Sequence, residues 1–393
     1  MENEILTPKG FKTASTHCGL KAAGKDDLAL VFSEVPCQLA GVFTTNKVKA
    51  APVLYDQQIV QSGKAVRGVV MNAGNANACN GEAGMLHTRQ MAQAAAAYIG
   101  AQADEMLVLS TGVIGVPLPV DKVEAGIKQL SPEGTAAAWM QTAQAIMTTD
   151  TRPKIVSVQS PSGYTITGIA KGAGMISPNM ATMLSVVATD AALTSAMLAK
   201  VPEVWAETFN RIVVDGDMST NDTVLLLANC ASGVTADVDG DFYENLYQVC
   251  VTLAKAIVQD GEGATKLVTV SVDGAASQQD AEQIARAIAT SPLCKTAFYG
   301  ADPNWGRIVC AAGYAQADFL PEQSRLFLQK GEEKILLFEN GRGANYDESA
   351  AIALMQTDAW EVALELGQGS ASYWLWTCDL SHEYVTINGH YRT

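Results

Sequence analysis

Lys171-Gly172-Ala173-Gly174-Met175-Ile176 leads into Pro178-Asn179-Met180-Ala181-Thr182-Met183-Leu184-Ser185 near the middle of this 393-residue chain. A threonine hydroxyl is a weak nucleophile until a base lies beside it, and an N-terminal threonine carries that base as its own α-amine. The reference pKa of an α-amine, about 8, leaves a fraction of it neutral at physiological pH. Cleavage between Ala181 and Thr182 would therefore turn Thr182 into a nucleophile with its own base.

Cleavage at this bond requires the Thr182 hydroxyl to attack the Ala181 carbonyl in an N-to-O acyl shift, which hydrolysis completes. The small Ala181 side chain leaves that carbonyl accessible, and Gly172 and Gly174 permit the close backbone approach that a strained bond needs. Ala-Thr is nevertheless a common dipeptide. On the local sequence alone, a threonine in a buried strand is by far the better explanation.

Composition excludes several classes of partner. The chain has 26 basic and 41 acidic residues, a net charge of -15 and 48% hydrophobic residues. It can bury a large core, while its charge repels nucleic acid and anionic membrane surfaces. The segment Met1–Pro8 lacks a basic and apolar leader, and no later stretch reaches the roughly 18 apolar residues of a membrane helix. These features predict a soluble, cytoplasmic protein.

The eight cysteines and four histidines are dispersed, without any CxxC motif or Cys/His cluster. Dispersed cysteines are typical of reduced thiols in a cytosolic protein, and they offer no ligand spacing for a metal. The sequence therefore predicts no metal site.

Apolar runs bounded by glycine or asparagine alternate with helical patterns, which predicts an α/β fold with soft domain boundaries and a smaller lobe formed by the last eighty residues. Strands are predicted at 67–71, 106–109, 155–158, 164–169, 223–228, 267–272, 334–338, 371–376 and 384–387, and helices at 85–99, 120–130, 195–209, 242–259 and 279–289.

The segment Lys171–Leu184 closely resembles the self-cleavage region of the ornithine acetyltransferase (glutamate N-acetyltransferase) family of arginine biosynthesis, the ArgJ proteins. The resemblance runs from about Gly10 to Thr393 and includes further motifs in the family's order. These are Ser110–Gly115, Met147–Thr151, Asp215–Thr223, Asp260–Lys266, Asp302–Arg307 and Cys378–His382.

The resemblance implies a precursor cut into an α chain, residues 1–181, and a β chain, residues 182–393, which pair into an α2β2 heterotetramer. It also implies a self-cleaving threonine-nucleophile α/β fold, an αββα-type sandwich of the DmpA/ArgJ kind in which helices flank two sheets. Thr182 would take acetyl from N2-acetylornithine, and glutamate would then accept it from the enzyme. The family uses no cofactor, and some members also accept acetyl-CoA as a co-substrate.

Further site residues follow from the matching positions. The family places its oxyanion hole at Thr111 and Gly112, and substrate contacts at Lys171 and Thr148, with Thr149 as the alternative if the register differs by one. Lys171 would supply positive charge for substrate carboxylates.

Glu262 matches a position that would bind the ornithine ammonium group, and Asn388 and Thr393 match positions where the chain end folds over the pocket. The polar segments 72–80 and 219–222 are expected to hold the backbone near the site without acting chemically. The segment Asp302–Arg307 lacks phosphate-loop spacing and predicts the start of a helix.

Two other functions remain open from the residues. An N-terminal-nucleophile aminopeptidase or amidase would share the cleavage and the threonine, but it would pass its acyl group to water. An uncleaved amino-acid-binding protein would need neither the cut nor the hydroxyl.

Overall fold

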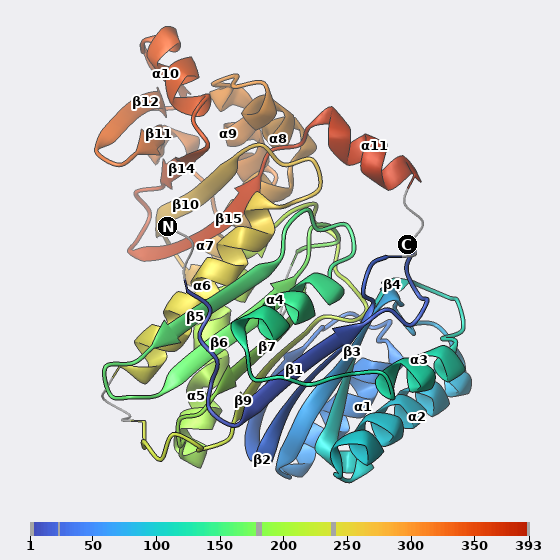
Figure 1. Cartoon of the computed structure of the whole chain (residues 1–393). Coiled ribbons are helices and arrows are strands. Elements are labelled where there is room, and N and C mark those ends of the chain that lie inside the picture. The colour runs from blue at the N-terminus through green and yellow to red at the C-terminus, as the bar shows by residue number, and fades with distance from the viewer. Residues whose placement is uncertain (1–3, 23, 178–182, 237–240, 391–393) are drawn as a thin grey trace. The chain divides into compact units, whose positions relative to one another are not determined.

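Two mixed sheets carry the fold, and each belongs to one of two compact units of the chain. The computed structural model describes residues 4–22, 24–177, 183–236 and 241–390. The first unit comprises residues 1–210, 217–257 and 392–393, and the second comprises 211–216 and 258–391. Both units combine helices with a sheet (Figure 1), so the predicted α/β class is confirmed.

Among the described residues, the first unit contains an eight-stranded sheet ordered β4-β3-β2-β9-β7-β6-β5, with β1 paired to β2. The pairs β3–β4 and β7–β9 are parallel, and the others are antiparallel. Its strands are β1 (Phe11–Thr16), β2 (Leu28–Phe43), β3 (Val66–Asn75), β4 (Met106–Val113), β5 (Lys154–Gln159), β6 (Thr165–Lys171), β7 (Leu184–Thr189) and β9 (Thr223–Ala228).

Helices cover both faces of this sheet, because its central strands carry apolar side chains on both faces and each face must be buried. Val69 and Met71 of β3 pack in a cluster with Trp139, whereas Val70 packs in another with Met91. Figure 1 shows the helices concerned. They are α1 (Ala51–Ser62), α2 (Gly81–Ile99), α3 (Val120–Ile127), α4 (Ala136–Ala145), α5 (Ser195–Ala206) and α6 (Phe242–Gln259), of which the last two residues of α6 belong to the second unit.

The second unit has a sheet ordered β13-β12-β11-β14-β10-β15-β8 among its described residues. Its strands are β8 (Ile212–Val213), β10 (Leu267–Ala275), β11 (Arg325–Lys330), β12 (Glu333–Glu339), β13 (Arg342–Gly343), β14 (Ala359–Glu365) and β15 (Ala371–Cys378). Its helices are α7 (Gln278–Thr290), α8 (Pro292–Tyr299), α9 (Trp305–Gly313), α10 (Glu348–Met355) and α11 (His382–His390).

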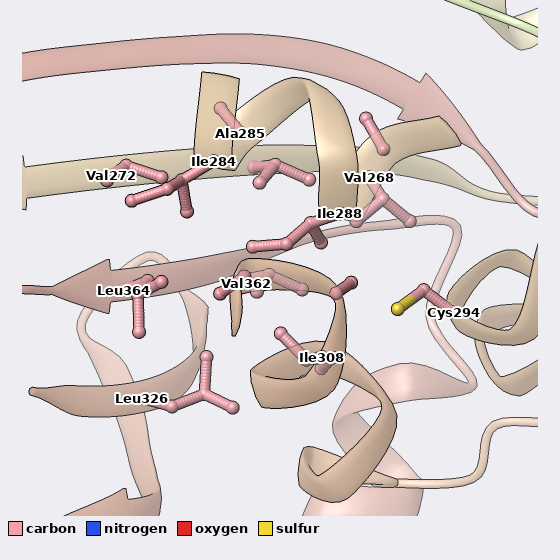
Figure 2. Close-up of a cluster of buried hydrophobic side chains, with 14 of the residues drawn as sticks. Val268, Val272, Ile284, Ala285, Ile288, Cys294, Ile308, Leu326, Val362 and Leu364 are labelled. Carbon is pink, nitrogen blue, oxygen red and sulfur yellow. The ribbon is translucent and has the colours of Figure 1, made fainter. Parts of the chain in front are cut away.

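The core of the second unit lies between its sheet and its helices (Figure 2). Val268 and Val272 of β10 point to one face at period two, and Ile284 and Ile288 of α7 meet them at helical spacing. These side chains are at most 2% exposed, so burial of their apolar surface stabilises the unit.

The expected smaller C-terminal lobe is present as the second unit, although it extends beyond the last eighty residues, because β10 pairs with both β14 and β15 and therefore belongs to the same sheet. One expected strand in this unit was wrong. Residues 384–387 form part of helix α11 and no strand. The Ser381 hydroxyl accepts the Glu383 N–H at 3.2 Å, which stabilises the start of a helix, and local caps override β-branched propensity there.

Other expected elements were correct. Strand β9 and helix α6 have the predicted bounds, and Asn304 caps α9 by accepting the Arg307 N–H, as expected for a helix start.

Candidate functional site

Thr111 and Gly112 lie near the carboxyl end of β4, where this strand leaves regular pairing with β3. Gly112 is opposite Gly74, and the register shifts immediately afterwards. Both glycines have positive φ, +130° and +108°. A Cβ on Gly112 would overlap the Gly74 carbonyl carbon, so only glycine permits this approach of the two strands. The pairing of β3 with β4 is thus irregular at the predicted oxyanion hole.

A buried hydrogen-bond network supports this strand end. Asn221 Nδ2 donates to Ala76 O at 2.6 Å and to Ser110 O at 2.8 Å. Ser110 Oγ donates to Asn72 Oδ1 at 2.6 Å, and Asn72 Nδ2 donates to the carbonyl of Asn75 at 2.8 Å. Asn221 thereby connects its own segment to the carboxyl ends of β3 and β4, and Asn72 adds a side-chain bond between these two strands. These bonds agree with the expectation that segments 72–80 and 219–222 hold the backbone here, and their lack of a chemical role stays a prediction.

Lys171 ends β6, and its side chain reaches β4. Its Nζ donates to Thr111 Oγ1 at 3.0 Å, although the two residues are 60 positions apart. In the antiparallel pairing of β6 with β7, Lys171 is opposite Leu184. The structure therefore brings two predicted site residues, Lys171 and Thr111, together. Lys171 also pairs with the first residue of β7, Leu184, which follows Thr182 by two positions.

Asp150 lies next to Lys171 in the folded unit, and its side chain is fully buried. Oδ1 accepts Lys154 Nζ at 2.6 Å and Gly172 N at 2.7 Å, and Oδ2 accepts Thr148 N at 3.0 Å. Burial alone would raise the pKa of this carboxyl. The charges of Lys171 and Lys154 and the donated hydrogen bonds outweigh burial and lower the pKa to about 2.

The backbone N–H groups of Thr148 and Gly172 therefore both donate to the Asp150 carboxylate, and Gly172 is the residue that follows Lys171. The side chains of Thr148 and Thr149 are both partly exposed, so the choice between them as a substrate contact stays a prediction.

Glu262 and Asn388, 126 positions apart, come together in the second unit. Asn388 Nδ2 donates to Glu262 Oε2 at 2.6 Å and to the carbonyl of Tyr384 at 3.0 Å. Glu262 is only 8% exposed, so this carboxylate needs such a donor. Ala181, Thr182 and Thr393 lie outside the described residues.

The sequence patterns gave no individual role to two polar residues near the site, Asp150 and Lys154. The i, i+4 spacing of Asp150 and Lys154 is a recognisable ion-pair signal, but only in a helix, and this pair lies in a loop and a strand. Asp222 belongs to the expected supporting segment 219–222. Burial raises the pKa of the Asp222 carboxyl well above its ordinary value, and its Oδ2 has no hydrogen-bond partner within the described residues.

In the part of the chain that the structure describes, no three His, Cys, Asp or Glu side chains group as metal ligands do. No helix there is long and apolar enough to cross a membrane.

Residues 12–393 match the sequence profile of the ArgJ family. The chain belongs to the ArgJ family. It is 45% identical to the arginine biosynthesis bifunctional protein ArgJ of Thermotoga neapolitana, with 99% of this chain and all of the relative covered. A relative named as mitochondrial, from Podospora anserina, is 44% identical over 98% of this chain and 89% of its own.

Among solved structures, this ArgJ-family chain is similar to an ornithine acetyltransferase from Mycobacterium tuberculosis, which is complexed with ornithine. The two are 46% identical, with 44% of this chain and 94% of that chain covered, and the TM-score is 0.43.

The contact of Gly112 with Gly74 generates a test of the predicted oxyanion hole. Gly112→Ala forces a Cβ into the Gly74 carbonyl, so we expect acetyl transfer to fall at least about 100-fold, the scale for a lost oxyanion donor. Gly115→Ala is the matched control, because Gly115 also has positive φ but its added Cβ would meet no atom within 4 Å. The measurement is the initial rate of acetyl transfer by each purified variant. Equal rates for Gly112→Ala and Gly115→Ala would contradict the expectation.

The lowered pKa of Asp150 predicts a specific acid dependence of stability. Its folded-state pKa lies below the ordinary value of 3.8, so the ionised carboxylate stabilises the fold above pH 4, and this contribution disappears as the pH falls towards 2. The lowering of the Asp150 pKa from 3.8 to about 2 corresponds to about 2 kcal/mol of stability. Urea unfolding at several pH values should show the difference between wild type and Asp150→Asn shrinking below pH 4. A difference that does not vary with pH would refute this assignment.

Proposed function

We propose that the chain transfers the acetyl group of N2-acetylornithine to glutamate through an acetyl ester on Thr182, after cleaving itself between Ala181 and Thr182. Membership of the ArgJ family and 45% identity to a bifunctional ArgJ protein over the full length assign it to arginine biosynthesis as an acyltransferase. The observation that carries the residue roles is the hydrogen bond between Lys171 Nζ and Thr111 Oγ1.

In the first half-reaction, the neutral α-amine of Thr182 takes the proton of its own hydroxyl, and Oγ1 attacks the acetyl carbonyl. Backbone N–H groups at Thr111 and Gly112 stabilise the oxyanion of the tetrahedral intermediate. The intermediate collapses with cleavage of the amide C–N bond, and the leaving nitrogen takes up the proton as ornithine departs.

In the second half-reaction, the neutral α-amine of glutamate attacks the acetyl-Thr182 ester. A second oxyanion forms at the same donors, Thr182 Oγ1 leaves and regains a proton, and N-acetylglutamate departs. The sum is N2-acetylornithine plus glutamate giving ornithine plus N-acetylglutamate. No water is consumed, and the acetyl group is recycled.

The described contacts support the assigned binding roles. Lys171, whose side chain reaches β4, offers a cation for the α-carboxylate that both substrates carry, with Thr148 held nearby through Asp150. Glu262, oriented by Asn388, offers an anion for the ornithine ammonium group. Thr393 completes the proposed substrate-binding set.

The two proposed chains share one sheet. Strand β6 precedes the cut and β7 follows it, and the two pair along six residues from Ile166–Thr189 to Lys171–Leu184. This pairing supports α and β chains that stay associated after cleavage, and we propose their further assembly into an α2β2 heterotetramer. The proposed compartment is the cytoplasm, although the Podospora anserina relative is named as mitochondrial.

Glutamate dependence distinguishes transfer from hydrolysis. With N2-acetylornithine alone, the enzyme should release about one equivalent of ornithine and then slow, since the acetyl ester awaits an amine acceptor. Adding glutamate should give continuous release with matching N-acetylglutamate. Thr182→Ala, as the control, should remain one uncleaved and inactive chain on a denaturing gel.

Equal ornithine release with and without glutamate would instead indicate an aminopeptidase or amidase. An active, uncleaved Thr182→Ala protein would remove Thr182 from the mechanism.

Acetyl-CoA is a proposed second donor, in line with the bifunctional name of the relatives. Attack of Thr182 on the thioester would give the same acetyl ester and release the CoA thiol. A thiol-reactive dye should report CoA release from acetyl-CoA plus glutamate in wild type, and none from Thr182→Ala. No release from wild type would limit the protein to acetyl recycling.

A further inference from the structure

The Asp150 carboxylate accepts hydrogen bonds from two backbone N–H groups and one side-chain ammonium of the first unit. The backbone donors are Thr148 in the turn after α4 and Gly172 at the end of β6, and the ammonium is that of Lys154 at the start of β5. The side chains of Asp150 and Lys154 are 0% and 1% exposed. Water therefore does not compete for these bonds, and their geometry is held firmly.

We infer that Asp150 is the positioning residue that holds Lys171 and Thr148 in place to bind the α-carboxylate of the substrates, an inference that rests on the proposed function. Asp150 does not contact substrate in this role. It acts through the two residues whose backbone it fixes.

The bond to Gly172 controls the direction of Lys171. The Gly172 N–H belongs to the peptide plane that joins it to Lys171, so anchoring this N–H on Oδ1 fixes the plane from which the Lys171 side chain departs. A side chain at position 172 would crowd this peptide, because a Cβ on Gly172 would come within 2.8 Å of Ile176 Cδ1. With the peptide held in this orientation, the Lys171 ammonium donates to Thr111 Oγ1 at 3.0 Å.

The hydrogen bond from Thr148 N to Asp150 links the position of Thr148 to that of Lys171. Thr148 N binds Oδ2 while Gly172 N binds Oδ1, so the rigid carboxylate sets the spacing of the two backbone segments. Lys21 secures the same turn from its other end, since its Nζ donates to the carbonyl of Ala145 at 2.6 Å.

The local charge also suits an anionic ligand. Lys154 and Lys171 both act on the single Asp150 carboxylate, and Lys154 is paired with it directly at 2.6 Å. Two ammonium groups and one carboxylate therefore act on one another at this place. A buried ion pair alone would need only Lys154, so the bonds to Thr148 and Gly172 indicate more than charge neutralisation.

Three variants separate positioning from a structural ion pair. Asp150→Asn removes the anchor for both N–H groups. Lys154→Gln breaks the same ion pair from its other side but keeps the Asp150 bonds to Thr148 and Gly172. Asp56→Asn is the matched control, since Asp56 is another buried acid of this unit, and its side chain accepts only Val108 N among the described contacts.

The readout is steady-state transfer from N2-acetylornithine to glutamate, with thermal unfolding in parallel. For Asp150→Asn, we expect KM to rise at least tenfold for both substrates and kcat to change less. KM should stay within threefold of wild type for Lys154→Gln and within twofold for Asp56→Asn, whatever their loss of thermal stability. Equal KM increases in Asp150→Asn and Lys154→Gln would overturn the inference.

A ligand pair tests the carboxylate directly. Ornithine and 1,4-diaminobutane differ only in the α-carboxylate, so the ratio of their inhibition constants measures recognition of that group. In Asp150→Asn, we expect the advantage of ornithine to fall at least tenfold, a change that a general loss of structure would not produce. An unchanged ratio would overturn the inference.

Should Asp150→Asn fail to fold, Asp150→Glu keeps the charge and displaces the carboxylate by one methylene. It should still reduce the ornithine advantage, and a wild-type ratio would count against positioning. Absence of transfer by wild type itself would refute the proposed function, and with it this inference. Normal wild-type transfer with an unaffected ratio refutes the inference alone.

Discussion

The antiparallel pairing of β6 with β7 is the constraint on which the candidate site depends. It places Lys171 opposite Leu184 and so aligns the cationic strand end with the strand that starts just beyond Thr182. It also links the two proposed chains by backbone hydrogen bonds. A ladder formed before the cut needs no new association afterwards, because the cut releases a covalent bond at the end of the strands and leaves the ladder itself in place.

Glycine and buried amides shape the carboxyl end of β4, where we propose the oxyanion hole. Gly74 and Gly112 allow β3 and β4 to approach beyond the point where side chains would collide, and Asn221 donates hydrogen bonds to the carbonyls of Ala76 and Ser110. Asp150 performs the corresponding task for Lys171 and Thr148. In both places a buried polar side chain supplies hydrogen bonds to backbone groups at a strand end, in addition to the strand pairing.

Periodicity predicted much of the fold. The apolar stripe of α6 and the buried run of β9 gave the right bounds, since each pattern lies within one element. The failure at residues 384–387 has a physical cause: β-branched residues favour a strand only where a neighbouring strand can pair with them, and here the cap at Ser381 starts a helix. The extent of the second unit also escaped prediction, because β10 is joined to β14 and β15 by pairing between residues distant in sequence.

The sequence by itself determined the family, the α/β class and the proposed nucleophile, because these depend on ordered motifs and on periodicity within short segments. Only the tertiary structure decided that Lys171 meets Thr111, that Asn388 meets Glu262, and that Asp150 joins Thr148 to Gly172. Lys171 and Thr111 are 60 positions apart, and Asn388 and Glu262 are 126 apart. No local pattern encodes such contacts, which arise when strand pairing and burial bring distant polar groups into places where each must find a partner.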